Sequence, residues 1–256
     1  MFGWYQQWRR KRLLVTPLDP AWMDMIQSRC KPFGSLSSEQ QTRLVNDVRI
    51  FIAEKHWEGC NGLVVTDEMR VTIAVQACLM ALGFPGVPFE RLLSVLIYPD
   101  TFVAKATRQQ PWGVVQENDE PRLGEAWYQG PVVLSWKEVL EQTTGVQPAR
   151  NVVIHEFSHL LDMQNREVDG IPDLDHTHSA NWVPIFEEAY ERLVRQARLG
   201  RVSVLDDYGA TSKIEFFAVS SEAFFEQPQR LRDEFPSLYG ILNEYYRQDP
   251  AAWILR

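Results

Sequence analysis

Residues 152–162 carry the pattern His-Glu-x-x-His inside a run of apolar residues, and this stretch constrains the chain more than any other. Its two histidines, His155 and His159, are four residues apart. On an α-helix, residues at that spacing lie on one face, one turn apart, so both imidazoles can reach the same small cation. The apolar residues around them recur at helical spacing, which predicts a helix over about 149–164. The pattern therefore indicates a helix with a cation-binding face.

The glutamate between the histidines adds a chemical constraint. Glu156 directly follows His155, so its carboxylate lies beside the cation rather than on it and can act on a water molecule there. This arrangement is typical of zinc peptidases. The same run also fits a buried core helix with two satisfied histidines, because a rigid metal-binding helix must be buried as well. The motif favours a zinc hydrolase over that alternative.

Composition excludes several classes of protein. Hydrophobic residues make up 45% and charged residues 23%, which are ordinary globular values. The formal net charge of −8 argues against nucleic acid as a direct partner, since nucleic-acid binding needs clustered cations. Three cysteines without a short metal-type spacing fit a reduced, cytoplasmic protein, and no run approaches the roughly 18 apolar residues of a membrane span. We therefore expect a cytoplasmic globular protein without a membrane span.

The N-terminal region differs from the rest of the chain. Residues 4–15 are basic and aromatic, and their apolar run is too short for a signal peptide. Prolines and a glycine in residues 16–36 predict a mostly irregular segment. We expect residues 1–35 to form an arm that is packed on the body or flexible. Residues 36–256 are expected to form a single zinc metallopeptidase domain.

Capping residues and periodicity place the remaining elements. Ser38 and Gln41 have the spacing of a capping box before one helix, and Thr66 begins a second helix that is apolar nearly all round through Leu82. Short runs typical of strands cover 92–98, 101–104, 112–115, 126–128 and 131–136, and further helices are expected at 137–143, 181–199, 212–225 and 238–246. The turn residues between the short runs favour a small mixed, partly antiparallel sheet beside the His-Glu helix. The expected fold class is α+β and mostly helical.

A catalytic zinc needs three protein ligands, and the histidines outside the motif do not settle the third. In the long metzincin motif, a glycine and a third histidine stand at positions that here hold Asp162 and Asn165, so that class is excluded. His176 and His178 lie in the polar loop that follows, and either could supply the third zinc ligand.

The helix expected at 212–225 offers three glutamates, Glu215, Glu222 and Glu226. The first two share a face but lie about 10 Å apart along the axis, so only one of them can be a ligand. Ser212 stands three residues before Glu215, which is the spacing of a capping box and would make Glu215 a helix-start residue. Glu222, for its part, could be an acid on the protein surface instead of a metal ligand. Glu215, however, is the single acid in a strongly apolar segment, where a carboxylate needs a partner such as a metal.

Three segments together resemble one known family. Residues 155–159 (HEFSH), 207–211 (DYGAT) and 215–222 (EFFAVSSE) are similar to the Mlc titration factor A family of bacterial zinc peptidases. The resemblance covers most of the chain, including residues 130–136. The separation between the tyrosine of the second segment and the glutamate that opens the third also looks like the catalytic part of anthrax lethal factor, a gluzincin. That second likeness covers the site alone.

The resemblance implies a zincin-like, gluzincin metallopeptidase fold with one Zn²⁺ per chain. By that likeness His155, His159 and Glu215 are the metal ligands. It also implies Glu156 as the catalytic base and Tyr208 as a hydrogen-bond donor to the transition state.

This sequence departs from one gluzincin pattern at Val219, where thermolysin-like enzymes carry an aspartate that supports the metal site. The departure leaves Asp162 and Glu222 as candidates for orienting the zinc histidines.

The resemblance further implies a cytoplasmic enzyme with aminopeptidase activity on small peptide substrates. It implies binding to the Mlc-type glucose repressor, and so modulation of glucose phosphotransferase system expression. The alternative is a non-catalytic, repressor-sequestering binding protein with a vestigial or structural zinc site. The combination of a base and a transition-state donor favours the enzyme, because a structural site needs neither.

Overall fold

The computed structural model describes residues 2–100, 130–143, 150–165, 168–174 and 179–253. Its helices are α1 (Phe2–Val15), α2 (Pro20–Arg29), α3 (Ser38–Glu54), α4 (Asp67–Met80), α6 (Trp136–Thr143), α7 (Val152–Asp162), α8 (Ser179–Arg198), α9 (Lys213–Glu226), α10 (Pro228–Glu234) and α11 (Pro236–Tyr246). Its strands are β1 (His56–Gly59), β2 (Ser94–Tyr98) and β3 (Val132–Ser135), and 3-10 turns occur at η1 (Phe33–Ser35), η2 (Met163–Asn165), η3 (Asp207–Ala210) and η4 (Pro250–Ala252). The expected α+β, mostly helical class agrees with these elements.

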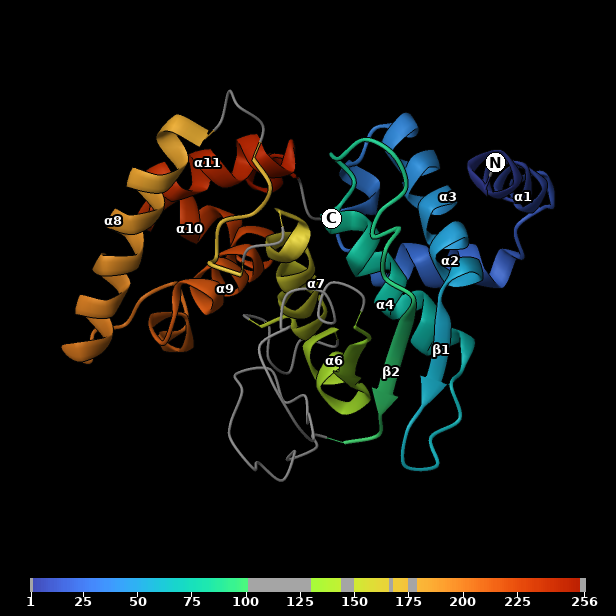
Figure 1. Cartoon of the computed structure of the whole chain (residues 1–256), viewed down its shortest axis with the longest axis horizontal. Coiled ribbons are helices and arrows are strands. Elements are labelled where there is room, and N and C mark those ends of the chain that lie inside the picture. Colours follow the sequence, from blue (N-terminus) through green and yellow to red (C-terminus); the bar gives the residue numbers. More distant parts are fainter. Residues whose placement is uncertain (1, 101–129, 144–149, 166–167, 175–178, 254–256) are drawn as a thin grey trace.

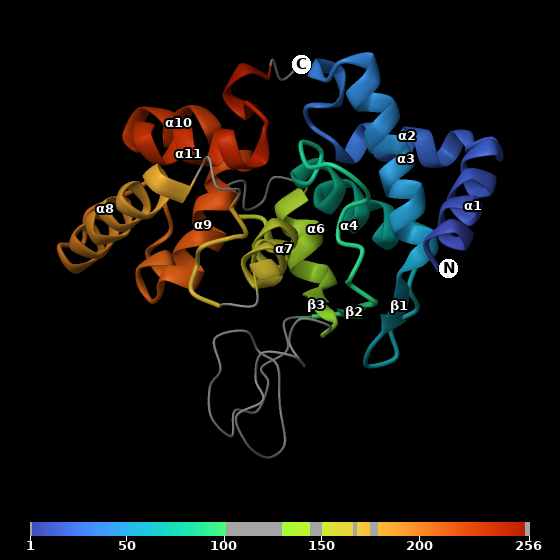
Figure 2. The same cartoon turned by 45° about the horizontal axis from the view of Figure 1, so that its top comes forward.

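Helix α7, which carries the His-Glu pattern, lies in the middle of the molecule (Figures 1 and 2). Helices α1 to α4 lie on one side of it, and α8 to α11 lie on the other. The buried apolar side chains form one continuous core that runs from Ile26 in α2 to Ala251 near the end of the chain. Val153 and Phe157 of α7 are fully buried within that core. The central helix is therefore held on both sides, which is what a rigid site requires.

The three described strands form one sheet in the order β1-β2-β3, and both pairings are parallel. Trp57 pairs with Val95, which pairs with Val132 on its other side. Parallel neighbours need a crossover connection, and α4 provides it between β1 and β2. The expectation of a mixed, partly antiparallel sheet is therefore wrong for these strands, because turn residues alone do not reveal strand direction. The short runs expected within 101–128 lie outside the described residues.

Residues 16–36 are not mostly irregular as expected, because α2 occupies Pro20–Arg29. The proline that suggested a loop stands at the first helical position, where its fixed φ is favourable and its missing N–H costs nothing. Asp19 caps the helix by accepting the N–H of Ala21 at 2.9 Å. Ile26 then joins the main core. The boundary between an arm and a domain at residue 36 stays a prediction.

Near α3, one local prediction was wrong and one strand was not predicted. The capping box before α3 consists of Ser37 and Gln40, one residue earlier than expected. The segment after α3 contains β1, which was not predicted because four residues give too short an alternation to recognise.

The cap by Thr66 is confirmed, since its side chain accepts the N–H of Met69. Helix α10 was also missed, since Pro228 stands at its first helical position.

Helix α1 is docked on α3 through charged side chains. Nε and Nη2 of Arg10 donate to the two carboxylate oxygens of Glu54, each at 2.8 Å. Nη1 of Arg10 lies 2.7 Å from Glu90. Arg49 of α3 donates in turn to the carbonyl oxygens of Leu13 and Thr16, at 2.7 and 2.5 Å. These bonds hold one face of α1 against the body.

We predict that Glu54→Gln loosens α1. The change keeps the shape of the side chain but removes one charge from a partly buried pair, which costs about 1–2 kcal/mol of docking free energy. Tryptic cleavage after Lys11 and Arg12 should therefore accelerate on the order of tenfold, as measured by intact mass. Glu58→Gln, at an exposed acid on β1, is the matched control. An unchanged cleavage rate in Glu54→Gln would show that this pair does not hold the helix.

Candidate metal centre

The two histidines of the site are positioned by the start of α7. Asn151 caps this helix, and its Oδ1 accepts the N–H of Ile154 at 3.1 Å. The cap fixes the register, so that His155 and His159 share one face with their ring centroids 4.9 Å apart. His159 is buried, and His155 is largely covered.

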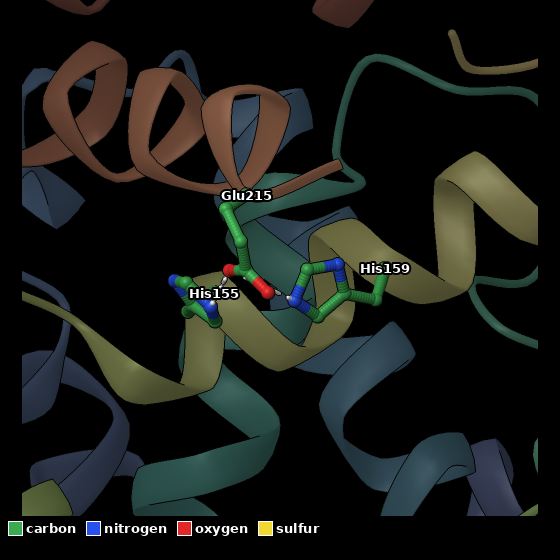
Figure 3. A group of neighbouring side chains, drawn as sticks. All are labelled: His155, His159 and Glu215. Atoms are coloured by element: carbon green, nitrogen blue, oxygen red, sulfur yellow. Dashed lines mark ion pairs between the residues drawn. The ribbon is translucent and has the colours of Figure 1, made fainter. Parts of the chain in front are cut away.

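The third member of the cluster comes from α9. Ser212 caps this helix and accepts the N–H of Glu215 at 3.2 Å. The capping interpretation is therefore correct for the backbone of Glu215, but its side chain turns to α7 instead. Figure 3 shows the Glu215 carboxylate pointing between the imidazoles of His155 and His159. The carboxylate is 1% exposed, so it depends on partners inside the protein.

The donor atoms of these three residues fit one small cation. Oε2 of Glu215 lies 3.0 Å from Nε2 of His155 and 3.8 Å from Nε2 of His159. Ligand atoms from all three lie within 4.8 Å of one another. Zinc bonds of about 2.0–2.2 Å in a tetrahedron would separate ligand atoms by roughly 3.4 Å, which lies between these two distances. Two imidazole nitrogens and one carboxylate oxygen are also a donor set that zinc prefers.

Glu222 lies behind His155, on the side away from Glu215. Its Oε1 is 2.7 Å from Nδ1 of His155, and its Oε2 accepts the N–H of Asn151 at 2.7 Å. The imidazole of His155 is therefore held between two carboxylates of α9. Glu226 is engaged elsewhere, since it accepts from Asn151 Nδ2 and from Lys31, each at 2.7 Å.

Asp162, the other candidate for orienting a histidine, is fully buried at the end of α7. Burial raises its pKa to about 7, although the N–H groups of Gly170 and Ile171 oppose that shift. Gly170 has a φ of +82°, and a Cβ there would lie 2.3 Å from the carbonyl oxygen of Lys213. Asp162 thus faces a tight loop that packs against the start of α9. His176 and His178 lie outside the described residues.

The charge around the histidines suits a cation. Burial lowers the pKa of His155, but the carboxylates of Glu215 and Glu222 outweigh it and raise this pKa to about 10. Burial and the charge of His155 hold the pKa of His159 well below its usual value. The cluster therefore stabilises positive charge at its centre.

Glu156 and Tyr208 flank this cluster. Burial raises the pKa of Glu156, His155 lowers it, and nearby carboxylates raise it, to about 7 in all. The ring of Tyr208 lies 6.1 Å from that of His155, and this tyrosine is 40% exposed. Burial and the neighbouring carboxylate of Glu215 raise the pKa of Tyr208 to about 12. Its hydroxyl therefore keeps its proton at neutral pH and can donate a hydrogen bond.

Sequence reasoning missed the pair that ties Tyr208 to α7. Oδ1 of Asp206 accepts the N–H of Tyr208 at 2.9 Å and caps η3. Oδ2 of Asp206 accepts two hydrogen bonds from Arg150, at 2.5 and 3.1 Å, and Arg150 directly precedes the cap of α7. Burial raises the pKa of Asp206, but these donors outweigh it and hold the pKa below its usual value. An aspartate two residues before the tyrosine was the available signal, since it is typical of an Asx turn.

Known proteins match this chain over most of its length. Residues 5–247 match the sequence profile of a family described as glucose-regulated metallo-peptidase M90. An uncharacterized protein of Synechocystis sp. (strain PCC 6803) is 37% identical over 245 residues, which cover 95% of this chain and 89% of that protein. A protein named Mlc titration factor A from Serratia proteamaculans (strain 568) is 33% identical over 224 residues, or 86% of this chain and 85% of that protein. Another of that name from Yersinia pestis (strain Pestoides F) is 31% identical over 226 residues, or 86% and 82%.

We predict that Glu215→Ala loses bound zinc on dialysis, because it removes one of three buried donors. Ser212→Ala is the matched control at the same end of α9. It removes the cap, costs about 1 kcal/mol of the free energy of unfolding, and should keep about one zinc per chain. Metal content by mass spectrometry and thermal unfolding separate the two effects. Full zinc retention in Glu215→Ala would place the third ligand elsewhere.

Proposed function

Since the chain belongs to the Mlc titration factor A family, the glucose-regulated M90 metallo-peptidases, we propose that it is a zinc-dependent peptidase of the aminopeptidase type with a gluzincin, zincin-like fold. The observation that carries this proposal is the buried convergence of His155, His159 and Glu215 from two helices. The aminopeptidase type itself rests on the family resemblance.

The proposed site holds one Zn²⁺ per chain through Nε2 of His155, Nε2 of His159 and the carboxylate of Glu215. A bound zinc supplies Lewis acidity, which acidifies water and polarises a carbonyl group. Glu222 positions His155, because its carboxylate accepts a hydrogen bond from the Nδ1–H group of His155. The lone pair of Nε2 is then free to bind the metal.

Glu156 is the proposed general base. It follows a ligand on the same helix, so its carboxylate lies beside the metal position rather than in it. It would take a proton from water as the water oxygen bonds to the peptide carbonyl carbon. The same carboxyl group would then give that proton to the leaving amine as the C–N bond breaks.

Tyr208 is the proposed donor to the oxyanion that develops during this attack. Its ring lies beside His155 and its hydroxyl stays protonated, as the raised pKa indicates. A donor held in place before the reaction stabilises developing charge at little cost of reorganisation.

The sheet offers a place for the peptide backbone. Strand β3 is one of the two outer strands of the described sheet, and it is the one that packs beside α7. We propose that an extended substrate pairs with this strand and so brings its carbonyl to the site. Pro131, which precedes β3, suits the end of such an edge.

A second proposed role follows from the names of the relatives, which refer to titration of Mlc. We propose that this chain acts in the cytoplasm, where it binds an Mlc-type glucose repressor and so modulates glucose phosphotransferase system expression. Among the described residues, no helix is long and apolar enough to cross a membrane. The competing function is a non-catalytic, repressor-sequestering protein with a vestigial or structural zinc site.

We predict that Glu156→Gln keeps zinc but lowers peptide hydrolysis by several orders of magnitude, since it removes the base and leaves the ligands. Hydrolysis of aminoacyl and internally blocked peptides, each with and without chelator, measures the activity and its type. The same variant should still capture the repressor in a pull-down. Near-normal turnover in Glu156→Gln would exclude Glu156 as the base. Repressor binding by a wild-type chain that hydrolyses none of these peptides would favour the competing function.

Tyr208→Phe should lower kcat on the order of 10²-fold and change KM little, because the hydroxyl acts mainly in the transition state. Zinc content should stay unchanged. Steady-state kinetics over a range of substrate concentrations measures both constants. A wild-type kcat would leave Tyr208 with a packing role only.

Asp206→Ala should also lower kcat, on the order of tenfold, because it frees the turn that positions Tyr208. Asp207→Ala changes the exposed neighbouring acid and is the matched control. In a Tyr208→Phe background, Asp206→Ala should have little further effect, since the donor is already gone. Full additivity of the two changes would show that Asp206 does not act through Tyr208.

A further inference from the structure

Helix α1 presents an exposed face of aromatic and basic residues, and we propose that this face binds the surface of an anionic phospholipid membrane. The attachment would be peripheral, with the helix lying in the plane of the headgroups. Neither the metal centre nor the function proposed for it enters into this inference.

The first observation is the exposure of large aromatic side chains. Trp4 is 75% exposed, Tyr5 56% and Trp8 46%, and Val15 further along is 84% exposed. At about 100° per residue, positions 4, 8 and 15 fall on the same side of the helix. These four residues form what we call the α1 face. Tyr5 and Trp8 stack with their ring centroids 6.1 Å apart, so the aromatic surface is continuous.

The exposure of this face does not come from a detached helix. Arg10 on the opposite side is bonded to Glu54, and Arg49 bonds the carbonyl groups at the end of α1. Leu13 and Leu14 are partly buried against the body. The helix is therefore docked with its aromatic side chains directed outward.

The second observation is charge. Helix α1 contains four basic residues and no acid, whereas the whole chain carries −8. Arg10 is neutralised by Glu54 and Glu90. Arg9, Lys11 and Arg12 are exposed, and none of the three has an ion-pair partner within the described ranges. Three uncompensated cations therefore border the α1 face.

The third observation is a groove beside the rings. A groove of about 400 Å³ lies between α1 and the end of α3, lined by Tyr5, Trp8, Arg9 and Arg12 and by the ion pair of Arg10 with Glu54, among others. The guanidinium of Arg12 lies 5.6 Å from the centroid of the Trp8 ring. An open groove with cations and indole walls can take a phosphate headgroup and part of its glycerol.

Together these observations favour an anionic bilayer over other partners. Tryptophan and tyrosine prefer the headgroup level of membranes, where lysine and arginine attract anionic lipids. The chain as a whole is acidic, so the uncompensated cations of α1 favour an approach to the bilayer by the α1 end. Helix α1 lies at the end of the molecule away from α8 and α9 (Figures 1 and 2), so attachment through α1 leaves those helices away from the membrane.

Co-sedimentation of the full chain with vesicles tests this proposal. Vesicles with about 30% phosphatidylglycerol in phosphatidylcholine should bind the chain at low salt, and pure phosphatidylcholine should not. Binding should fall steeply as salt rises, because surface charge is screened. A blue shift of tryptophan fluorescence should accompany binding.

Two variants and a matched control locate the contact. Arg9→Gln/Lys11→Gln/Arg12→Gln should lower partition about 10²-fold, at about fivefold per cation. Trp4→Ala/Trp8→Ala should lower it on the order of tenfold. Arg195→Gln/Arg198→Gln/Arg201→Gln removes three exposed cations at the end of α8 and should bind like wild type. Thermal unfolding should be alike in all four proteins, since the changed side chains are exposed.

Three results would overturn the proposal. The first is absence of binding to the anionic vesicles. The second is an equal loss of vesicle binding in the α8 control and in the α1 variant that replaces three cations. The third is loss of repressor or nucleic-acid binding in the α1 variants without any effect on vesicles, which would assign the face to a macromolecule instead.

Discussion

The carboxylate of Glu222 sets the relation between the two helices that form the metal centre. One of its oxygens holds Nδ1 of His155, and the other accepts the N–H of Asn151 at the start of α7. The contact with Asn151 is buried and the one with His155 is partly buried, and an unpaired carboxylate there would cost several kcal/mol. They fix α9 against α7 in a single register, and from that register Glu215, seven residues earlier, comes to lie opposite Nε2 of His155. The cluster thus depends on a contact outside it.

The opposite end of α9 is fixed independently. Ser212 starts the helix, and the backbone of Gly170 packs so closely on Lys213 that no side chain fits there. The pair of Arg150 and Asp206 then joins the turn that carries Tyr208 to the residue before the α7 cap. His155, Glu215 and Tyr208 are therefore each tied to the beginning of α7 or α9. This is how a site of three donors keeps its geometry although its helices are far apart in sequence.

The sequence was most informative where a local rule decides the structure. Helical spacing located α7, and the side-chain oxygen of Thr66 marked the start of α4. It was least informative where contacts between distant segments decide. The apolar segment around Glu215 favoured it over Glu222, but both lie on one face of α9, and only the packing on α7 places one beside the histidine Nε2 atoms and the other behind His155. The parallel direction of the sheet likewise arises from tertiary structure. So do the hydrogen bonds by which Arg10 and Arg49 join α1 and the residue after it to α3. Pro20 was misread because a proline starts a helix as readily as it ends one.

The buried carboxylates also explain why a cation and the fold belong together. Glu215 and Glu222, which are buried, and the half-buried Glu156 all act on His155. Like charges in such a place repel one another, and burial adds to the cost, so the folded chain gains from any positive charge at their centre. A divalent ion that binds the folded chain and not the unfolded one stabilises it in proportion to the logarithm of its concentration over its Kd. The residues that would perform the chemistry are thus the same ones whose burial makes the folded state favour a metal.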